Sequence, residues 1–278
     1  FLMGADMLAY FPQWVYPERI LKIATPAVCA RHGSADVAAA CRQLKEQFGV
    51  DAVTIGYTGS AVSSTRVRVR ASLGADIAPY VPPAIADYIG KHGLYVMPEL
   101  VKARKLMSEK RAAHTLRVAF MAAENCRRLG IPEKKAVVTA ALHDAAKNLK
   151  LSDRLLKGFV PPEGVPESVM HQYSGAYLAE HVFGVTDEDM LNAIRYHTSG
   201  RPGMSPLEKL IFLCDMLEEG RDFDGADELR AEFARDIDAC LEHSLGRELE
   251  YLRAEGKEIY PLTQQAYDYI SAVRAGKK

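Results

Sequence analysis

Histidines and aspartates in the second half of the chain are of the residue types that bind divalent metal ions. His143 and Asp144 stand side by side near the end of an alanine-rich apolar run over 134–146. If this run is a helix, Asp144 shares one face with Val137 and Ala140, and that face should pack into the core. A buried carboxylate is costly unless a positive partner compensates it, and a metal ion is the strongest such partner.

Further candidate ligands lie on other segments with helical periodicity. They are His114 in a helix predicted over 105–129, His171 in one over 167–183, His197 at the end of one over 187–197, and Asp215 in a helix that Ser205-Pro206 opens. Each histidine taken singly is more often a hydrogen-bonded core or surface residue than a ligand. Together with His143 and Asp144, these residues are too many for one tetrahedral ion. They suit two ions, such as Fe, Mn or Zn, that share a carboxylate and a water.

Composition and charge limit the classes of protein to which the chain can belong. Its 278 residues are enough for two domains, and 48% hydrophobic with 26% charged residues is typical of a soluble globular protein. At a formal net charge of -1, the protein has no overall positive charge that would attract nucleic acid or an anionic membrane. The five cysteines form no CxxC pair, and no apolar run reaches the roughly 18 residues of a membrane span. We therefore expect a cytoplasmic protein without a nucleic-acid or membrane partner; its oligomeric state stays open, a homodimer included.

The first third of the chain has a different pattern from the rest. Short apolar runs predict buried strands at 1–3, 27–30 and 52–55. The segment 34–48 predicts a helix, and strand, helix and strand in this order indicate a parallel α/β unit. The chain starts inside the first strand, from which we expect upstream sequence. Helical periodicity dominates from Glu99 onward, so we predict a mostly α fold: an all-helical bundle preceded by a partial α/β, Rossmann-like domain, with the boundary near Met97-Pro98.

Ser63, Ser64 and Thr65 precede Arg66 and Arg68 in a segment that suits phosphate binding. Free backbone N–H groups at a helix start, with a guanidinium in the first turn, can bind phosphate. A simple Ser/Thr helix cap explains the same residues. Both interpretations stay open from the spacing alone.

This segment belongs to a longer series of motifs. In order they are Met3-Gly4-Ala5-Asp6, Trp14 with Pro17-Glu18, Ser63-Ser64-Thr65-x-Val67-Arg68, Val81-Pro82-Pro83, Tyr88-Ile89 and His92-Gly93-Leu94-Tyr95. Together they resemble the C-terminal half of bacterial nicotinate-nucleotide adenylyltransferases, over residues 1–96. The residues that the resemblance implies for contacts with ATP phosphates are Ser63, Ser64, Thr65 and Arg68, and those that line the nucleotide pocket are Asp6 and Trp14. The HxGH segment of that family has no counterpart here, so we expect residual nucleotide binding at best and no catalysis from this part as it stands.

The candidate metal ligands lie in a second ordered series of motifs. The series comprises His114-Thr115-Leu116-Arg117-Val118, His143-Asp144-x-x-Lys147, His171-x-x-x-Gly175, His197-Thr198-x-Gly200, and Asp215 followed by Arg221-Asp222-Phe223. It resembles the HD superfamily of metal-dependent phosphohydrolases, and within it the bacterial symmetrical diadenosine tetraphosphate hydrolases, over residues 100–270. One departure is Cys214, where an alanine is more usual before the aspartate. The candidate ligand Asp215 itself is unchanged. We accordingly predict a truncated adenylyltransferase-like domain over 1–97 and an HD domain over 98–278.

The second resemblance implies a di-iron site, with Mn or Zn as alternatives, that hydrolyses diadenosine tetraphosphate to two ADP through a metal-activated water. The implied grouping is His114, His143 and Asp215 on one ion and His171 and His197 on the other, with Asp144 as the bridge. Lys147 could bind a substrate phosphate or the charge that develops on it, although a solvated lysine at a helix end explains its position equally well. Arg221 is a further candidate for phosphate binding, and a salt bridge with Asp222 is the alternative.

Three other functions stay open at this point. An HD phosphohydrolase could act on another nucleotide, such as a dNTP or an alarmone, because the ligands set the reaction while the pocket sets the base. The first domain, when complete, could make dinucleotide from nicotinate mononucleotide and ATP, which is a step of NAD biosynthesis. A non-catalytic metal or nucleotide sensor would bind its ligand without turnover.

Overall fold

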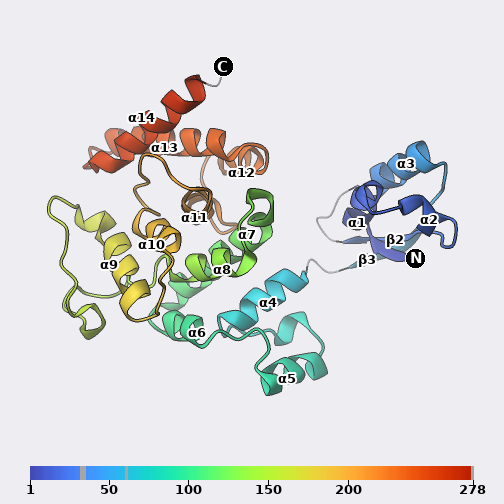
Figure 1. Ribbon diagram of the computed structural model, residues 1–278, viewed down its shortest axis with the longest axis horizontal. Coiled ribbons are helices and arrows are strands. Elements are labelled where there is room, and N and C mark those ends of the chain that lie inside the picture. Colours follow the sequence, from blue (N-terminus) through green and yellow to red (C-terminus); the bar gives the residue numbers. More distant parts are fainter. Residues whose placement is uncertain (32–35, 60–61, 277–278) are drawn as a thin grey trace. The chain divides into compact units, whose positions relative to one another are not determined.

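The computed structural model describes residues 1–31, 36–59 and 62–276. It divides into two compact units, Phe1–Ser63 and Ser64–Lys278. Each unit has a hydrophobic core of its own, and Figure 1 labels the elements of both.

The first unit is a parallel sheet with short helices, which confirms the predicted α/β unit. Its strands, in sheet order, are β1 (Leu2–Gly4), β2 (Ala27–Arg31) and β3 (Val53–Gly59). Its helices are α1 (Ala5–Tyr10), α2 (Pro17–Leu21) and α3 (Val37–Phe48). The Asp36 carboxylate accepts a hydrogen bond from Ala38 N at 2.8 Å and caps α3, and Gly49 ends the helix at φ +68°. Residues 34 and 35, where the predicted helix began, lie outside the described part of the chain.

The second unit is helical throughout its described residues, which confirms the predicted bundle. Its α-helices are α4 (Ser64–Ser72), α5 (Pro83–His92), α6 (Pro98–Lys105), α7 (Glu109–Asn125), α8 (Glu133–Leu142), α9 (Glu167–His181), α10 (Glu188–Arg195), α11 (Pro206–Leu217), α12 (Ala226–Arg235), α13 (Ile237–Ala254) and α14 (Pro261–Ala275). Helix α7 contacts α8 and α11, and α10 contacts α9 and α11 (Figure 1). Val118, Ala140, Leu210 and Ile211 are fully buried among these helices, so the centre of the unit lies where α7, α8, α10 and α11 meet.

The division between the two units lies earlier in the chain than the predicted domain boundary at 97/98. Helix α4 belongs to the second unit because it contacts α7. Val69 and Leu73 of the α4 segment are part of the main core, and Arg66 Nε lies 2.8 Å from Glu124 Oε1 of α7. Side-chain contacts therefore define the compact unit, while the boundary at 97/98 stays a prediction about where the two series of motifs meet.

The prediction of one long helix over 105–129 is wrong. The chain ends α6 at Lys105 and starts α7 at Glu109. Ser108 explains the break, since its side-chain hydroxyl accepts a hydrogen bond from Arg111 N at 3.3 Å and caps a new helix. The new helix start fixes where the side chains of α7 point, including that of His114.

The helix predicted over 134–146 also ends earlier, at Leu142. Beyond that residue the hydrogen bonds tighten to the i→i−3 type, and Lys147 N donates to Asp144 O at 3.0 Å. His143 and Asp144 are therefore the first residues of a turn rather than part of the helix. Both side chains of this turn are buried.

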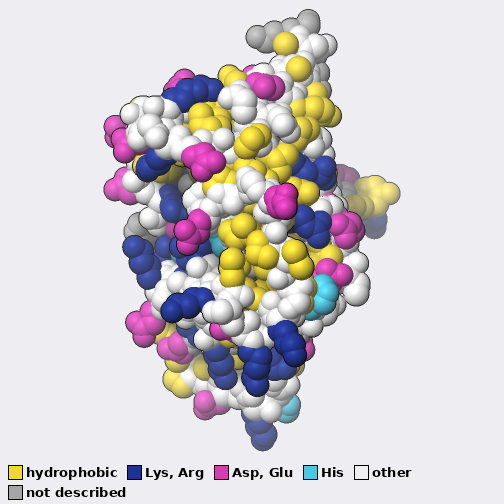
Figure 2. All heavy atoms as spheres, turned by 90° about the vertical axis from the view of Figure 1, so that its left-hand side faces the viewer, with side chains coloured by type: hydrophobic (Ala, Val, Ile, Leu, Met, Phe, Trp, Pro, Cys, Tyr) yellow, Lys and Arg dark blue, Asp and Glu magenta, His cyan; other side chains and the backbone are white. Residues whose placement is uncertain are grey.

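Charged side chains of both signs are interspersed on the surface. Figure 2 shows lysines and arginines next to aspartates and glutamates on one face, with hydrophobic side chains grouped between them. This mixture agrees with the formal net charge of -1, so attraction for an anionic ligand has to arise locally. In the described part of the chain no helix has the length and apolar character needed to cross a bilayer. All five cysteines lie in described segments and are free thiols.

Candidate metal centre

Helices α7 to α11 bring the six predicted metal ligands together. His114 comes from α7, His143 and Asp144 from the turn after α8, His171 from α9, His197 from the turn after α10, and Asp215 from α11. Five of them are buried with 9% or less of the residue exposed, and Asp215 is half-buried. Polar groups that converge in the interior from separate helices need a partner that replaces water.

Asp144 lies in the middle of the group, and its two carboxylate oxygens face different histidines. Asp144 Oδ2 lies 3.9 Å from His114 Nε2 and 3.5 Å from His143 Nε2. Asp144 Oδ1 lies 3.5 Å from both His171 Nε2 and His197 Nε2. The carboxylate thus separates the four imidazoles into two pairs.

Asp215 lies beside the first of these pairs. Its Oδ1 atom is 2.9 Å from His114 Nε2 and 3.9 Å from His143 Nε2. In each of two groups of three residues, one potential ligand atom per residue lies within 4.8 Å of the other two. The first group is His114, His143 and Asp215, and the second is His143, Asp144 and His197. Both sets have the spacing from which a single ion could be bound.

Backbone carbonyls fix the orientation of two of the imidazoles. The His143 Nδ1 atom lies 2.7 Å from Ala140 O, and His197 Nδ1 lies 2.8 Å from Ile194 O. Since a carbonyl oxygen only accepts, each Nδ1 atom is the donor and carries the hydrogen. The Nε2 lone pairs of both rings are therefore directed into the centre, as metal-binding imidazoles require.

Four buried atoms at the centre have no hydrogen-bond partner in the described part of the chain. They are His114 Nε2, His143 Nε2, His197 Nε2 and Asp144 Oδ1. An unsatisfied buried acceptor costs about 1–3 kcal/mol, so several in one place are unfavourable unless a ligand satisfies them. Imidazole nitrogens and carboxylate oxygens together suit a divalent transition-metal ion. The residues present fit such an ion.

Electrostatics keep Asp144 and His171 in the protonation states that bind metal. The pKa of His143 differs, because burial alone would lower it whereas Asp144 and Asp215 raise it. Burial alone would raise the pKa of Asp144, but His143 and His197 hold that pKa far below its usual range. Burial, together with the nearby His197 and Lys147, lowers the pKa of His171 to about 2. Asp144 is therefore ionised and His171 is neutral at physiological pH, with a lone pair available on its ring.

Three cationic side chains lie at the rim of the centre, and two of them were predicted. Lys147 Nζ lies 3.0 Å from both ring nitrogens of His171 and can donate to the one that carries no hydrogen. Arg221 Nη2 lies 2.9 Å from Asp215 Oδ1, so its partner is Asp215 and not Asp222, the partner considered from the sequence. The third cation, Arg111, was missed, and its Nη1 lies 2.5 Å from Asp144 Oδ2. Its position three residues before His114 on the same helix was the available signal.

Glu218 is a further residue that the sequence did not reveal. It is buried, and its Oε1 atom accepts from His114 Nδ1 at 3.0 Å and from Arg117 Nη2 at 2.9 Å. Burial would raise the pKa of Glu218, but hydrogen bonds from Arg117 and His114 lower it to about 2. The carboxylate thus holds the hydrogen on His114 Nδ1 and directs Nε2 inward, as carbonyls do for His143 and His197.

Gln172 attaches the turn that carries His197 to α9. Its Oε1 atom accepts from Thr198 N at 3.2 Å and Ser199 N at 3.1 Å, and its Nε2 donates to Ser199 Oγ at 2.9 Å. Thr198 Oγ1 in turn lies 3.0 Å from His171 Nε2. This network, in which Gln172 and Ser199 are fully buried and Thr198 is half-buried, fixes the positions of His171 and His197 relative to each other.

The helical part of the chain is similar to known proteins. Residues 111–220 match the HD domain family. A symmetrical bis(5'-nucleosyl)-tetraphosphatase of Bacillus subtilis (strain 168) is 35% identical over 178 residues, which are 62% of this chain and 95% of the relative. The chain belongs to this family of HD-domain proteins.

Two further relatives agree with this assignment. A crystal structure of a predicted HD superfamily hydrolase involved in NAD metabolism, from Clostridium acetobutylicum, has a TM-score of 0.54 and 30% identity and covers 62% of this chain and 96% of its own. A probable nicotinate-nucleotide adenylyltransferase/Ap4A hydrolase of Mycoplasma genitalium is 28% identical over 224 residues, or 80% of this chain and 60% of the relative. The matched HD domain contains all six predicted ligands as well as Arg111 and Glu218.

The six residues predicted to bind nucleotide through the first domain are divided between the two units. Asp6, Trp14 and Ser63 are in the first unit, and Ser64, Thr65 and Arg68 are in the second. Asp6 is exposed, and the Trp14 ring packs against Phe11 with the centroids 5.2 Å apart. Arg68 Nη2 lies 3.3 Å from Glu133 Oε1 of the HD domain, so its guanidinium already has an anionic partner. Nucleotide binding by these residues stays a prediction.

Gly175 lies one turn after His171, where α9 passes close to the metal centre of the HD domain. A Cβ atom at this position would lie 3.3 Å from His143 O and 3.4 Å from Ile194 Cγ2. We expect Gly175→Leu to lower the free energy of unfolding by about 1–3 kcal/mol, since the larger side chain has to displace backbone at the centre. Urea unfolding of the purified variant measures this loss.

Gly90 of α5 offers a matched control for this prediction. A Cβ atom at Gly90 would have no heavy atom within 4 Å. Gly90→Leu is therefore expected to be neutral or slightly stabilising, because leucine has the higher helix propensity. Equal losses of stability in the two variants would contradict the close approach at Gly175.

Proposed function

We propose that this chain hydrolyses diadenosine tetraphosphate symmetrically to two ADP. The observation that carries the proposal is the buried group of imidazole nitrogens and carboxylate oxygens whose inward atoms have no partner in the described chain. The name of the Bacillus subtilis relative, a symmetrical bis(5'-nucleosyl)-tetraphosphatase, supports the same reaction. A dinucleoside polyphosphate is thus the proposed substrate.

The proposed cofactor is a pair of divalent ions, with iron favoured by the resemblance and Mn or Zn as alternatives. Asp144 supports the number of ions, because its Oδ2 atom faces His114 and His143 while its Oδ1 atom faces His171 and His197. The position of Asp215 next to His114 supports its assignment to the first group. When bound, two such ions lower the pKa of a shared water and stabilise charge on phosphate oxygens.

The cations at the rim have the proposed role of holding the polyphosphate. Arg111, Lys147 and Arg221 each contact a side chain of the centre, and each can exchange this contact for a phosphate oxygen of the substrate. Lys147, which reaches over the ring of His171, is placed to stabilise the negative charge that develops on an inner phosphate. Because the protein has almost no net charge, this local cluster and the ions supply the attraction.

A second part of the proposal concerns the organisation of the chain. We infer that residues 1–97 derive from an adenylyltransferase-like domain and that residues 98–278 form the HD domain. The Mycoplasma genitalium relative supports this division, since its name combines an adenylyltransferase with an Ap4A hydrolase. Helix α4 of the first part is then a structural element of the second unit.

Product analysis with diadenosine tetraphosphate and protein purified without oxygen tests the function. We expect two molecules of ADP for each substrate consumed, loss of turnover after chelation, and recovery when a divalent ion is returned. ATP plus AMP would contradict the symmetrical reaction. Hydrolysis of a dNTP or an alarmone, with diadenosine tetraphosphate untouched, would favour another HD phosphohydrolase, and metal binding without any turnover would favour a sensor.

A further inference from the structure

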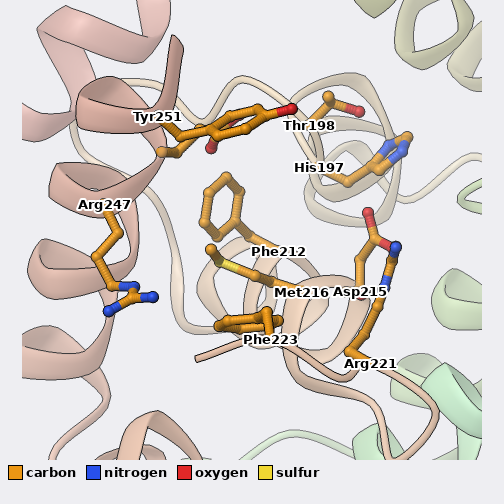
Figure 3. Close-up of a pocket in the computed structure, with 10 residues that line it drawn as sticks. His197, Thr198, Phe212, Asp215, Met216, Arg221, Phe223, Arg247 and Tyr251 are labelled. Atoms are coloured by element: carbon orange, nitrogen blue, oxygen red, sulfur yellow. Dashed lines mark hydrogen bonds and ion pairs between the residues drawn. The ribbon is translucent and has the colours of Figure 1, made fainter. Parts of the chain in front are cut away.

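A cavity of about 420 Å³ opens beside the metal centre of the HD domain. Its walls come from the turn after α10, from α11 and the segment that follows it, and from α13 (Figure 3). The volume lies within the range of roughly 300–1,000 Å³ that is usual for sites that bind small molecules. Helix α13 lies outside residues 111–220, the segment that matches the HD domain family.

The two ends of this cavity differ in chemistry. One end is lined by residues of the metal centre and its rim, His197, Asp215 and Arg221. Away from the metal centre the lining is mostly apolar or aromatic, from Phe212, Met216, Phe223 and Tyr251, with the Arg247 guanidinium 5.8 Å from the centroid of the Phe223 ring. Figure 3 shows the rings of Phe212 and Tyr251 directed into the same space. A ligand that fills the cavity can therefore place an anionic group next to Arg221 and a flat group between Phe212 and Tyr251.

Tyr251 offers an aromatic surface for a flat ligand. Tyr251 is 53% exposed, so its ring is accessible to a ligand, whereas Phe212, which also lines the cavity, is 3% exposed. Lys257 Nζ donates to the Tyr251 hydroxyl at 2.7 Å and lies 4.5 Å from the ring centroid, so the ring is held from the solvent side. A ring held in this way can stack on a base with little loss of conformational entropy.

Glu248 adds a polar group to the same wall, three residues before Tyr251 on α13. Its half-buried carboxylate has no hydrogen-bond or ion-pair partner in the described part of the chain. Burial, with the negative charge of Asp215 nearby, raises the pKa of Glu248 to about 7. Whether ionised or neutral, the side chain keeps an oxygen that can accept a hydrogen bond from a ligand N–H group.

We propose that this cavity binds the purine base of the nucleotide substrate, with Tyr251 stacked on the base and Glu248 accepting a hydrogen bond from its exocyclic amino group. The proposal rests on the function proposed above and extends it by assigning base recognition to α13. The phosphate chain then runs from the cavity past Arg221 to the metal centre, because Arg221 lines the cavity and pairs with Asp215 of that centre.

Equilibrium binding to the metal-loaded protein tests the stacking role without turnover. The probes are ADP and methylenediphosphonate, which has the two phosphorus centres but no base. We expect Tyr251→Ala to weaken ADP binding about tenfold, because base–aromatic stacking is lost, and to leave methylenediphosphonate binding unchanged. Tyr251→Phe keeps the ring and should bind ADP within about threefold of the unaltered protein.

A second comparison tests Glu248 separately. The unaltered protein should bind ADP more tightly than purine riboside 5'-diphosphate, which lacks the exocyclic amino group, and Glu248→Ala should remove this difference. Unchanged ADP binding in Tyr251→Ala would overturn the stacking role, as would equal weakening of ADP and methylenediphosphonate. A preference for ADP that persists in Glu248→Ala would overturn the role of the carboxylate. If the chain binds ADP in this pattern but does not hydrolyse diadenosine tetraphosphate, the proposed function fails while base recognition stands.

Discussion

Replacing Asp144 with asparagine is expected to abolish both metal loading and hydrolysis of diadenosine tetraphosphate while the helices stay folded. Each carboxylate oxygen of Asp144 faces a different pair of imidazoles, so both positions lose a ligand atom or its charge in the variant. The amide has nearly the same shape as the carboxylate, which limits the effect on packing. It carries no negative charge, however, and its NH2 group repels a cation at one of the two positions.

Elemental analysis of protein purified without oxygen, paired with product analysis and circular dichroism, measures the three parts of this result. Asp222→Asn is the matched control, because Asp222 is exposed and only one residue from Arg221. It should retain metal and at least half of the activity, a loss within about 0.5 kcal/mol, as is usual for surface substitutions. His143→Ala should behave like Asp144→Asn. Full metal content or unchanged turnover in Asp144→Asn or in His143→Ala would contradict the proposed metal centre.

The predicted ligands could be found from the sequence because polar residues on apolar helical faces are unusual. His143 and Asp144 stand out for this reason in an alanine-rich run, and the order of the other motifs supplies the remaining candidates. The local geometry could not be predicted in the same way. The end of α8 at Leu142 depends on i→i−3 hydrogen bonds in the following turn, and these do not alter the apolar periodicity.

Arg111 and Glu218 escaped prediction for a different reason. Arg111 lies in the charged first turn of α7, and Glu218 begins a charged segment after α11; such residues are usually solvated. Only tertiary contacts distinguish them: Arg111 lies against Asp144, and Glu218 lies against His114 across 104 residues of sequence. The assignment of α4 to the second unit also follows only from tertiary contacts, since Leu73 is buried by residues from far along the chain. Sequence motifs thus identify the groups that do chemistry more readily than the groups that position them.

Glu218→Gln is expected to weaken metal binding by about 10–100-fold, although Glu218 does not itself face the centre. The carboxylate accepts hydrogen bonds from His114 Nδ1, Arg117 and Gly220 N. Glutamine keeps one carbonyl acceptor and turns an NH2 group toward groups that are all donors. His114 then loses the partner that holds its hydrogen on Nδ1, so the lone pair of Nε2 is no longer directed inward in every molecule. The Arg117 guanidinium also loses its ionic partner.

Metal titration of the apoprotein, alongside its thermal unfolding, distinguishes this positioning role from a purely structural one. Glu219→Gln is the matched control, because the neighbouring glutamate is exposed and pairs with Arg66 at the surface. It should change metal affinity by less than about threefold, which is the usual limit for a surface ion pair. If Glu218→Gln lowered the unfolding temperature of the apoprotein but bound metal with unaltered affinity, Glu218 would be a structural anchor of α11 and would not orient His114. A loss of metal affinity in apoprotein that unfolds at its normal temperature would instead show that the carboxylate acts through the imidazole.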